Sequence, residues 1–203
     1  MQPDTAGAEV VEARIKGAAI QPFFAWYAQQ WGPERLRQAV AGMTESLGSC
    51  FDLDEEHMGV LPSAWYPAPS LHALLDRLLA SHTAAERELI TRDGARAIIE
   101  STLKGVYRWL FEAMMSPERY GRNAQELFSR YHEAGTMIKE PIGESGHLTI
   151  VRDWPGHHPL LCEFLIHTAD YVYTALGCRN VKIRRVACVA TGHPDCRFEV
   201  TWS

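Results

Sequence analysis

The hydrophobic pattern of this chain of 203 residues changes its period near Gly135. Before Gly135 the apolar residues recur at steps of three and four, as on one face of a helix. After Gly135 the pattern shortens, and the stretch 196–202 alternates between apolar and polar residues, as a strand with one buried face does. The first two thirds of the chain are therefore predicted to form helices. The last third is predicted to consist mainly of the strands of a sheet.

Turn and capping residues set the boundaries of the expected helices. Helices are predicted over 15–32, from 33 onward, over 70–79, over 84–115 with a break near Asp93-Gly94, and over 116–134. Ser116-Pro117-Glu118 has the order of a cap, a first-turn proline and an acid facing the helix dipole. The stretch 48–69 is expected to be irregular, and residues 1–14 are expected to be a flexible lead-in to one domain over 15–203.

Two hairpins and one helix are predicted after Gly135. Strands are expected over 137–142 and 147–154, a helix over 158–176, and strands over 180–191 and 196–202. Sequential hairpins imply an antiparallel sheet. The predicted fold class is therefore α+β, with N-terminal helices packed on a C-terminal sheet of order strand-strand-helix-strand-strand.

Composition narrows the class of protein. With 46% hydrophobic and 22% charged residues, the chain matches a globular domain. Its formal charge of −5 argues against a nucleic-acid binder, which needs a dense basic face. No signal peptide and no apolar stretch long enough for a membrane span is evident, so a cytoplasmic protein is predicted. The odd count of five cysteines also favours a reducing compartment.

Three of the cysteines belong to the C-terminal unit. Cys162 is expected in the first turns of a helix, Cys188 on the penultimate strand and Cys196 at the start of the last strand. His193, in the turn between the last two, completes a Cys-x4-His-x2-Cys pattern. A helix beside a hairpin turn can supply the four ligands that zinc prefers. Alternatively, the thiols are small buried hydrophobic groups where the helix meets the sheet.

The C-terminal stretch 188–202, preceded by a helix bearing Cys162, resembles the vinyl reductase (4-vinyl reductase) domain family. That family provides effector-binding sensor domains in bacterial aromatic-responsive activators, and it shares its fold with heme-NO-binding domains and TRAPP subunits. Shorter pieces recur in the same order: Ile15-Lys16-Gly17, Trp65-Tyr66-Pro67, Ser116-Pro117-Glu118 and 131–135. Together they are most similar to a standalone family, numerous in myxobacteria, whose function is unknown.

The resemblance has consequences for the candidate metal site. In phenol-responsive members three cysteines and one glutamate hold zinc, and the spacing of the three cysteines fits here. The position of that glutamate, three residues before the second cysteine, is occupied by Arg185. His193 is the first candidate to replace it as fourth ligand, and Glu163 is the second. Zinc is thus a candidate cofactor, whereas no heme or nucleotide is expected.

The resemblance leaves two classes of function open. The first is a non-enzymatic sensory module that binds a small hydrophobic or aromatic molecule and acts through a partner protein. Candidate pocket residues are Trp26, Tyr107, Trp109, Phe111, His167 and Tyr171, all of which could instead be ordinary core residues. The second is a TRAPP-like dimeric scaffold that acts on a small GTPase without a ligand. A homodimer is expected in either case. No dinucleotide fingerprint, P-loop or Gly-x-Ser-x-Gly elbow suggests an enzyme.

Overall fold

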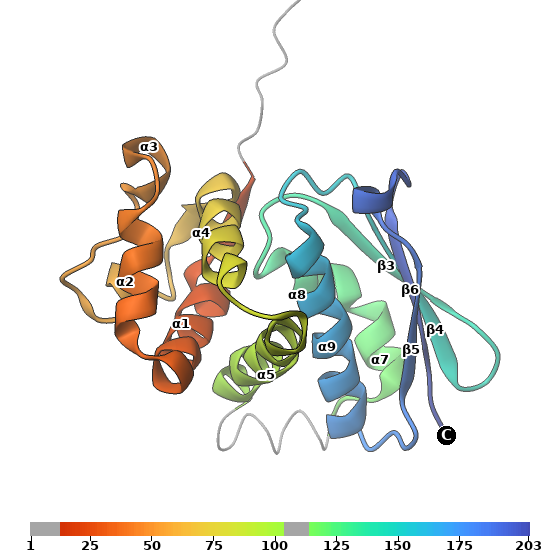
Figure 1. Ribbon diagram of the computed structural model, residues 1–203. Coiled ribbons are helices and arrows are strands. Elements are labelled where there is room, and N and C mark those ends of the chain that lie inside the picture. The colour runs from red at the N-terminus through yellow and green to blue at the C-terminus, as the bar shows by residue number, and fades with distance from the viewer. Residues whose placement is uncertain (1–12, 104–113) are drawn as a thin grey trace, which may run out of the picture.

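The computed structural model describes residues 13–103 and 114–203. It arranges them as helices at one side and a sheet at the other (Figure 1). Between these two parts lies α9, which packs against α5 on the helical side and against strands of the sheet on the other. The predicted α+β class is confirmed, and the meeting of helices and sheet encloses the sites described below.

The N-terminal part consists of helices, all of which except α3 have buried residues. They are α1 (Gly17–Trp31), α2 (Pro33–Ala41), α3 (Glu45–Gly48), α4 (Ala68–Ala80) and α5 (Ala84–Thr102). The leucines of α4 recur at helical spacing and are buried. Thr83 caps α5: its hydroxyl accepts the Glu86 N–H, and the Glu86 carboxylate accepts the Thr83 N–H.

Helix α5 continues through Gly94, where a break was predicted. A Cβ on Gly94 would lie 2.8 Å from Phe23 of α1 and 3.1 Å from Phe164 of α9. The glycine therefore allows three helices to approach closely, and it does not end the helix. The predicted break was wrong because glycine in a helix can serve packing as well as termination.

A two-stranded sheet lies where no strand was predicted. Strand β1 (Arg14–Lys16) pairs with β2 (Trp65–Pro67) in antiparallel register, with Ile15 opposite Tyr66. Arg14 thus belongs to a strand, although the flexible lead-in was predicted to include it. Three residues are too few to show a period, which explains why the sequence did not reveal these strands.

The predicted helix over 116–134 forms two shorter helices. They are α7 (Pro117–Arg122) and α8 (Ala124–Ser129). Between them, Asn123 has φ −97° and ψ 9°, and its side-chain amide donates to the carbonyl of Arg119. An asparagine that bonds the preceding turn in this way competes with a continuous helix.

The main sheet contains four antiparallel strands in the order β3-β4-β6-β5. Its elements in sequence are β3 (Thr136–Pro141), β4 (Gly146–Arg152), α9 (Pro159–Ala175), β5 (Lys182–Ala187) and β6 (Cys196–Thr201). The predicted strand 180–191 ends at Ala187, because a 3-10 turn forms over Val189–Thr191. On β6, Cys196, Phe198 and Val200 are buried, as the alternation predicted.

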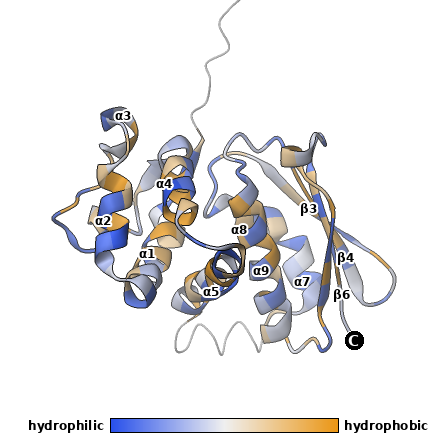
Figure 2. Ribbon diagram, in the orientation of Figure 1, coloured by the Kyte–Doolittle hydropathy of each residue, from blue (hydrophilic) through white to orange (hydrophobic). Residues whose placement is uncertain are grey.

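The apolar core runs from the N-terminal helices to the inner face of the sheet. Figure 2 shows hydrophobic residues on α1, α4, α8 and α9. Among the helices that the structure describes, none is long and apolar enough to cross a membrane.

Candidate functional site

A cavity of about 520 Å³ lies where the helices meet β3. Ile15 and Phe23 from the N-terminal part line it, and Leu161 and Phe164 of α9 face them. Further apolar lining residues are Ala19, Ile20, Leu71, Leu75, Ile98, Ile99, Leu103, Met115, Ala124, Leu127, Phe128, Met137, Leu165 and Val172. The volume falls within the range of roughly 300–1,000 Å³ that small-molecule sites occupy.

The predicted pocket residues that the structure describes lie elsewhere. Trp26 packs edge-on against Trp31, with ring centroids 5.3 Å apart, and Tyr171 donates a hydrogen bond to Glu100 over 3.2 Å. None of the predicted residues Trp26, Tyr171 and His167 lines the cavity. The remaining predicted residues, Tyr107, Trp109 and Phe111, lie outside the described part of the chain.

His132 brings a polar group to this apolar cavity. Its ring stacks on Phe128, with centroids 4.4 Å apart, and packs edge-on against Trp154. The Nδ1 atom is buried and has no hydrogen-bond partner among the described residues. Burial lowers the pKa of His132 to about 3, so the imidazole is neutral near pH 7.

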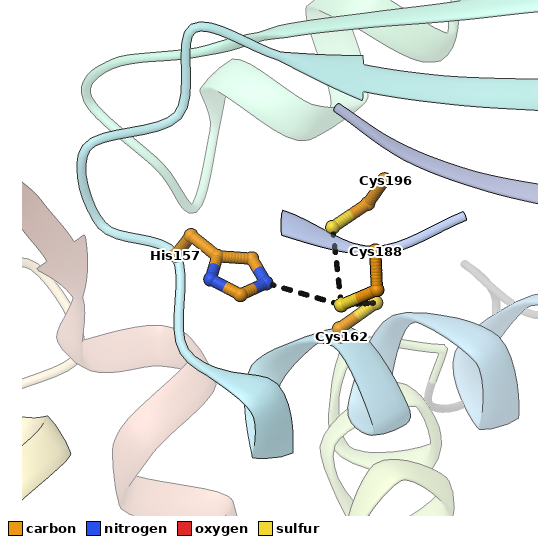
Figure 3. A group of neighbouring side chains, drawn as sticks. All are labelled: His157, Cys162, Cys188 and Cys196. Carbon is orange, nitrogen blue, oxygen red and sulfur yellow. Dashed lines mark hydrogen bonds between the residues drawn. The ribbon is translucent and has the colours of Figure 1, made fainter. Parts of the chain in front are cut away.

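A second group of side chains lies at the N-terminal end of α9. Cys162, Cys188, Cys196 and His157 point toward one another (Figure 3), and one donor atom from each lies within 4.8 Å of all the others. The Sγ atom of Cys188 is 3.6 Å from Sγ of Cys196, 4.0 Å from Sγ of Cys162 and 3.6 Å from Nε2 of His157. All three thiols are buried.

Four different segments position these side chains. Cys162 lies in the first turns of α9, whose start is set by Pro159. Cys188 follows the end of β5, and Cys196 begins β6. His157 lies in the loop between β4 and α9, where its backbone N–H donates to the carbonyl of Trp154 over 3.0 Å. The group thus joins the sheet to the helix that borders the cavity.

The spacing of the donors matches tetrahedral coordination. A zinc ion bonded to sulfur at about 2.3 Å places two sulfur ligands about 3.8 Å apart. The distances of Cys188 from Cys196 and Cys162, 3.6 and 4.0 Å, bracket that value. Three sulfurs and one imidazole nitrogen are also a donor set typical of structural zinc sites.

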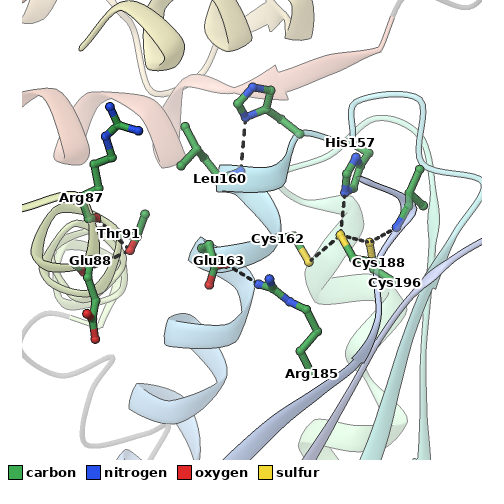
Figure 4. Close-up of polar contacts among 12 residues, drawn as sticks. Arg87, Glu88, Thr91, His157, Leu160, Cys162, Glu163, Arg185, Cys188 and Cys196 are labelled. Carbon is green, nitrogen blue, oxygen red and sulfur yellow. Dashed lines mark hydrogen bonds and ion pairs between the residues drawn. The ribbon is translucent and has the colours of Figure 1, made fainter. Parts of the chain in front are cut away.

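The structure places the two predicted fourth ligands outside this group. His193 is exposed in the turn before β6 and does not belong to it. Glu163 instead forms an ion pair with Arg185 over 2.6 Å (Figure 4). Arg185, which occupies the position of the family's glutamate, is thus neutralised by a carboxylate, and His157 approaches the thiols from the opposite side.

The contacts among the three thiols favour the ionisation of Cys196 and oppose the ionisation of the other two. A hydrogen bond with Cys196 and burial raise the pKa of Cys162, and burial raises the pKa of Cys188. The hydrogen bond with Cys162 lowers the pKa of Cys196 to about 5. One negative charge is therefore favoured over three, and a divalent cation is the kind of partner that would allow all three to be thiolates.

Sequence reasoning missed both His157 and His132. The available signal for His157 was its place five residues before Cys162, at the entry to the same helix. His132 lies in the motif 131–135 that was noted for its resemblance. Nothing in the sequence distinguishes a histidine that faces a cavity from one packed in the core.

No protein-family model matches the chain, and no curated protein matches it in sequence. Solved structures of H-NOX proteins, however, match almost all of it. The Fe(II) unliganded H-NOX protein from K. algicida gives a TM-score of 0.66 at 13% identity, covering 93% of this chain and 97% of that one. A variant of the H-NOX protein from T. Tengcongensis gives 0.66 at 9% identity, covering 93% and 98%.

An oxygen-binding H-NOX domain related to soluble guanylate cyclases gives a TM-score of 0.62 at 7% identity and covers 93% of this chain and 95% of its own. At such identities the likeness concerns the fold alone. The likeness confirms that this chain has the fold of the heme-NO-binding domains, as the resemblance implied. The vinyl reductase, TRAPP and myxobacterial parts stay predictions.

The same neighbours contradict the expectation of no heme. One of them is an Fe(II) protein, and another, with a TM-score of 0.67, was determined to probe heme distortion in the H-NOX family. The cavity of this chain is compatible with such a group, because most of its lining is apolar and its described lining includes one nitrogen donor, His132. By its structure, the chain has the fold of the H-NOX proteins.

Proposed function

We propose that this protein is a sensory ligand-binding module without catalytic activity, in which the cavity between the helices and β3 holds an apolar molecule. The observation that carries the proposal is the cavity itself, which has about 520 Å³ of space lined mainly by aliphatic and aromatic side chains. A few polar groups in an apolar cavity are typical of small-molecule sites. A change in the occupancy of the cavity would be transmitted to a partner protein. We also propose that the chain forms a homodimer.

His132 is the polar contact that we assign to the bound molecule. Its buried Nδ1 lacks a partner, and leaving a buried polar atom unpaired costs about 1–3 kcal/mol. Because the imidazole is neutral, it favours an uncharged hydroxyl or carbonyl group over a carboxylate. Heme, if it is the occupant, would supply an iron centre. His132 would then be the residue that holds the iron through its imidazole. Arg130, whose guanidinium pairs with Glu126, would be the cation at the same cavity for the carboxylates of the group.

Binding of a neutral fluorescent probe tests the cavity directly. N-phenyl-1-naphthylamine should bind saturably with about one probe per chain, and hemin titrated separately should give a shifted Soret band if heme fits. In the variant Leu165→Trp, a lining residue of α9 fills the cavity, so both signals should fall at least tenfold. Leu89→Trp, on the exposed side of α5, should bind as the wild type does. Equal binding by both variants would contradict the proposal.

We further propose that Cys162, Cys188, Cys196 and His157 hold a structural zinc ion. Four protein donors close the coordination sphere, so the ion would stabilise the junction of loop, helix and sheet and would not activate water. Elemental analysis of protein purified without chelator should find one zinc per chain. A strong chelator should then lower the melting temperature, because the metal binds only the folded arrangement. Zinc-free protein with an unchanged melting temperature would contradict this part.

A further inference from the structure

The amine of Lys139 lies on the inner face of the main sheet, among aromatic rings. Lys139 of β3 is opposite Thr149 of β4, which is opposite Phe198 of β6. The Nζ atom of Lys139 donates to the Thr149 hydroxyl over 2.7 Å and lies 5.6 Å from the centre of the Phe198 ring. Helices α7 and α9 add Tyr120 and Tyr173, whose ring centres lie 5.0 and 5.4 Å from the same nitrogen. One hydroxyl and three rings therefore hold the amine.

No carboxylate balances the charge of this amine in the described part of the chain, and burial lowers the pKa of Lys139 to about 7. Aromatic rings attract an ammonium group through their faces, but they do not replace the water that it loses on burial. At pH 7 about half of the protein molecules therefore carry an uncharged, nucleophilic Lys139, whereas about one in three thousand ordinary lysine side chains is uncharged.

Lys139 is next to the cavity described above. Tyr120, one of the rings around the amine, also lines that cavity. Met137 lines it as well and precedes Lys139 by two residues on β3, so the two side chains leave the same face of the strand. Lys139 itself is not a lining residue. A molecule in the cavity can therefore reach the amine only when the Tyr120 side chain turns aside.

We propose that Lys139 forms an imine with an apolar aldehyde that occupies the cavity and reaches the amine past Tyr120. This inference rests on the proposed function, because it names the class of molecule that the cavity holds. The Nζ lone pair attacks the aldehyde carbon, and the carbonyl oxygen then leaves as water with the two hydrogens of the amine. The imine is uncharged, so it suits a site in which an ammonium group is poorly solvated.

Reductive trapping on the wild-type chain tests the proposal. Benzaldehyde and sodium cyanoborohydride are added at pH 7, and peptide mapping reports the rate of labelling at each lysine. Lys16 lies over the Trp65 ring and Lys182 is exposed on β5, so both are internal references. Lys139 should be labelled at least about tenfold faster than either, because far more of it is uncharged. 4-Formylbenzoate is the matched reagent: its carboxylate should keep it out of the apolar cavity, so it should show no preference for Lys139.

The pH dependence of this preference reports the uncharged amine. The ratio of labelling at Lys139 to labelling at Lys182 should be constant below pH 7 and should fall between pH 7 and pH 10. Above pH 7 the uncharged fraction of Lys139 is near its limit, whereas that of an ordinary lysine still increases. The ratio cancels any effect of pH on the reagents, and a ratio that rises above pH 7 would contradict the proposal.

The titratable groups around Lys139 do not change charge over this range. Burial raises the pKa of Tyr120 of α7 to about 12 and also raises the pKa of Tyr173 of α9, so both tyrosines stay uncharged. Burial and the charge of Lys139 lower the pKa of His147 of β4, while Glu118 of α7 raises it to a lesser extent. His147 is therefore uncharged near pH 7 and above.

The cavity variant shows whether the aldehyde enters as proposed. Leu165→Trp should lower labelling at Lys139 and leave labelling at Lys182 as in the wild type. Equal labelling of Lys139 in this variant and the wild type, or no preference for Lys139 over Lys16 and Lys182, would overturn the proposal. N-phenyl-1-naphthylamine binding is measured on the same preparations. Probe binding without labelling of Lys139 overturns the imine alone, whereas loss of both signals from the wild type overturns the proposed function as well.

Discussion

His157 and His193 flank the thiol group in sequence but differ in what their imidazoles contact. Nε2 of His157 lies 3.6 Å from Sγ of Cys188, whereas His193 is exposed. His157→Ala should weaken zinc binding by more than the roughly 10–100-fold that outer partners of metal ligands contribute. His193→Ala should leave it unchanged. Competition with a chromogenic chelator measures both, and equal affinities of the two variants would remove His157 from the site.

These two histidines show which part of the metal site the sequence could not predict. The thiol positions could be anticipated because strand parity and helix position fix where Cys162 and Cys196 point. The fourth donor could not, because loop conformation decides which imidazole turns inward. The β4–α9 loop brings His157 to the cluster through a backbone hydrogen bond to Trp154, and no periodic pattern encodes that bond.

His132 should make stability depend on pH. Its pKa is about 3 in the folded chain, against an ordinary value of 6.5, so between these values the unfolded chain binds more protons. The free energy of unfolding should therefore fall as pH decreases below 6.5, by at most about 1.4 kcal/mol per pH unit for this group. His132→Leu should flatten that dependence in urea titrations at pH 5 and 7.

His193→Leu is the control for this pH effect, because the imidazole of His193 is exposed in the turn before β6. The other histidines whose pKa is lowered by burial, His72, His147 and His167, remain in both variants and cancel in the comparison. If His132→Leu keeps the full pH dependence of the wild type, His132 is not held neutral by its surroundings.

Helix α5 depends on Gly94 for its contact with α1 and α9. In Gly94→Ala the new methyl group would lie 2.8 Å from Phe23, and overpacking of this kind costs about 1–3 kcal/mol. Gly48→Ala is the matched control, because its Cβ would approach nothing closer than 3.6 Å. Thermal melts should show a loss for Gly94→Ala alone. A gain at Gly94 would mean that the three helices do not pack as described.

Elements with a strong period were predictable, and short ones were not. Helix α4 has a leucine face, and β6 alternates over its six residues, so both were recognised. Strands β1 and β2 have three residues each and depend on pairing between distant segments. The interruption at Asn123 depends on one side-chain hydrogen bond. The local sequence pattern is enough to predict elements that bury a whole face. The short strands and the interruption at Asn123 depend on contacts that this pattern does not contain.

At the scale of the molecule, α9 connects the two candidate sites. Leu161 and Phe164 face the cavity, and Cys162, between them in sequence, faces the thiol group. A change at one site therefore acts on an element of the other. The predicted α+β architecture packs helices on a sheet, and the cavity lies where the helices meet β3. Which side chains line it could not be anticipated, because Trp26, His167 and Tyr171 lie on the same helices but face other neighbours.

The central claim is that the cavity holds an apolar molecule. Native mass spectrometry of wild-type protein, purified without chelator or detergent, tests it most directly and also reports the oligomeric state. The account predicts a bound organic molecule or heme on the wild type and on Leu89→Trp, and its loss from Leu165→Trp. The claim is contradicted if the wild type carries no such molecule and none can be loaded, or if Leu165→Trp retains it.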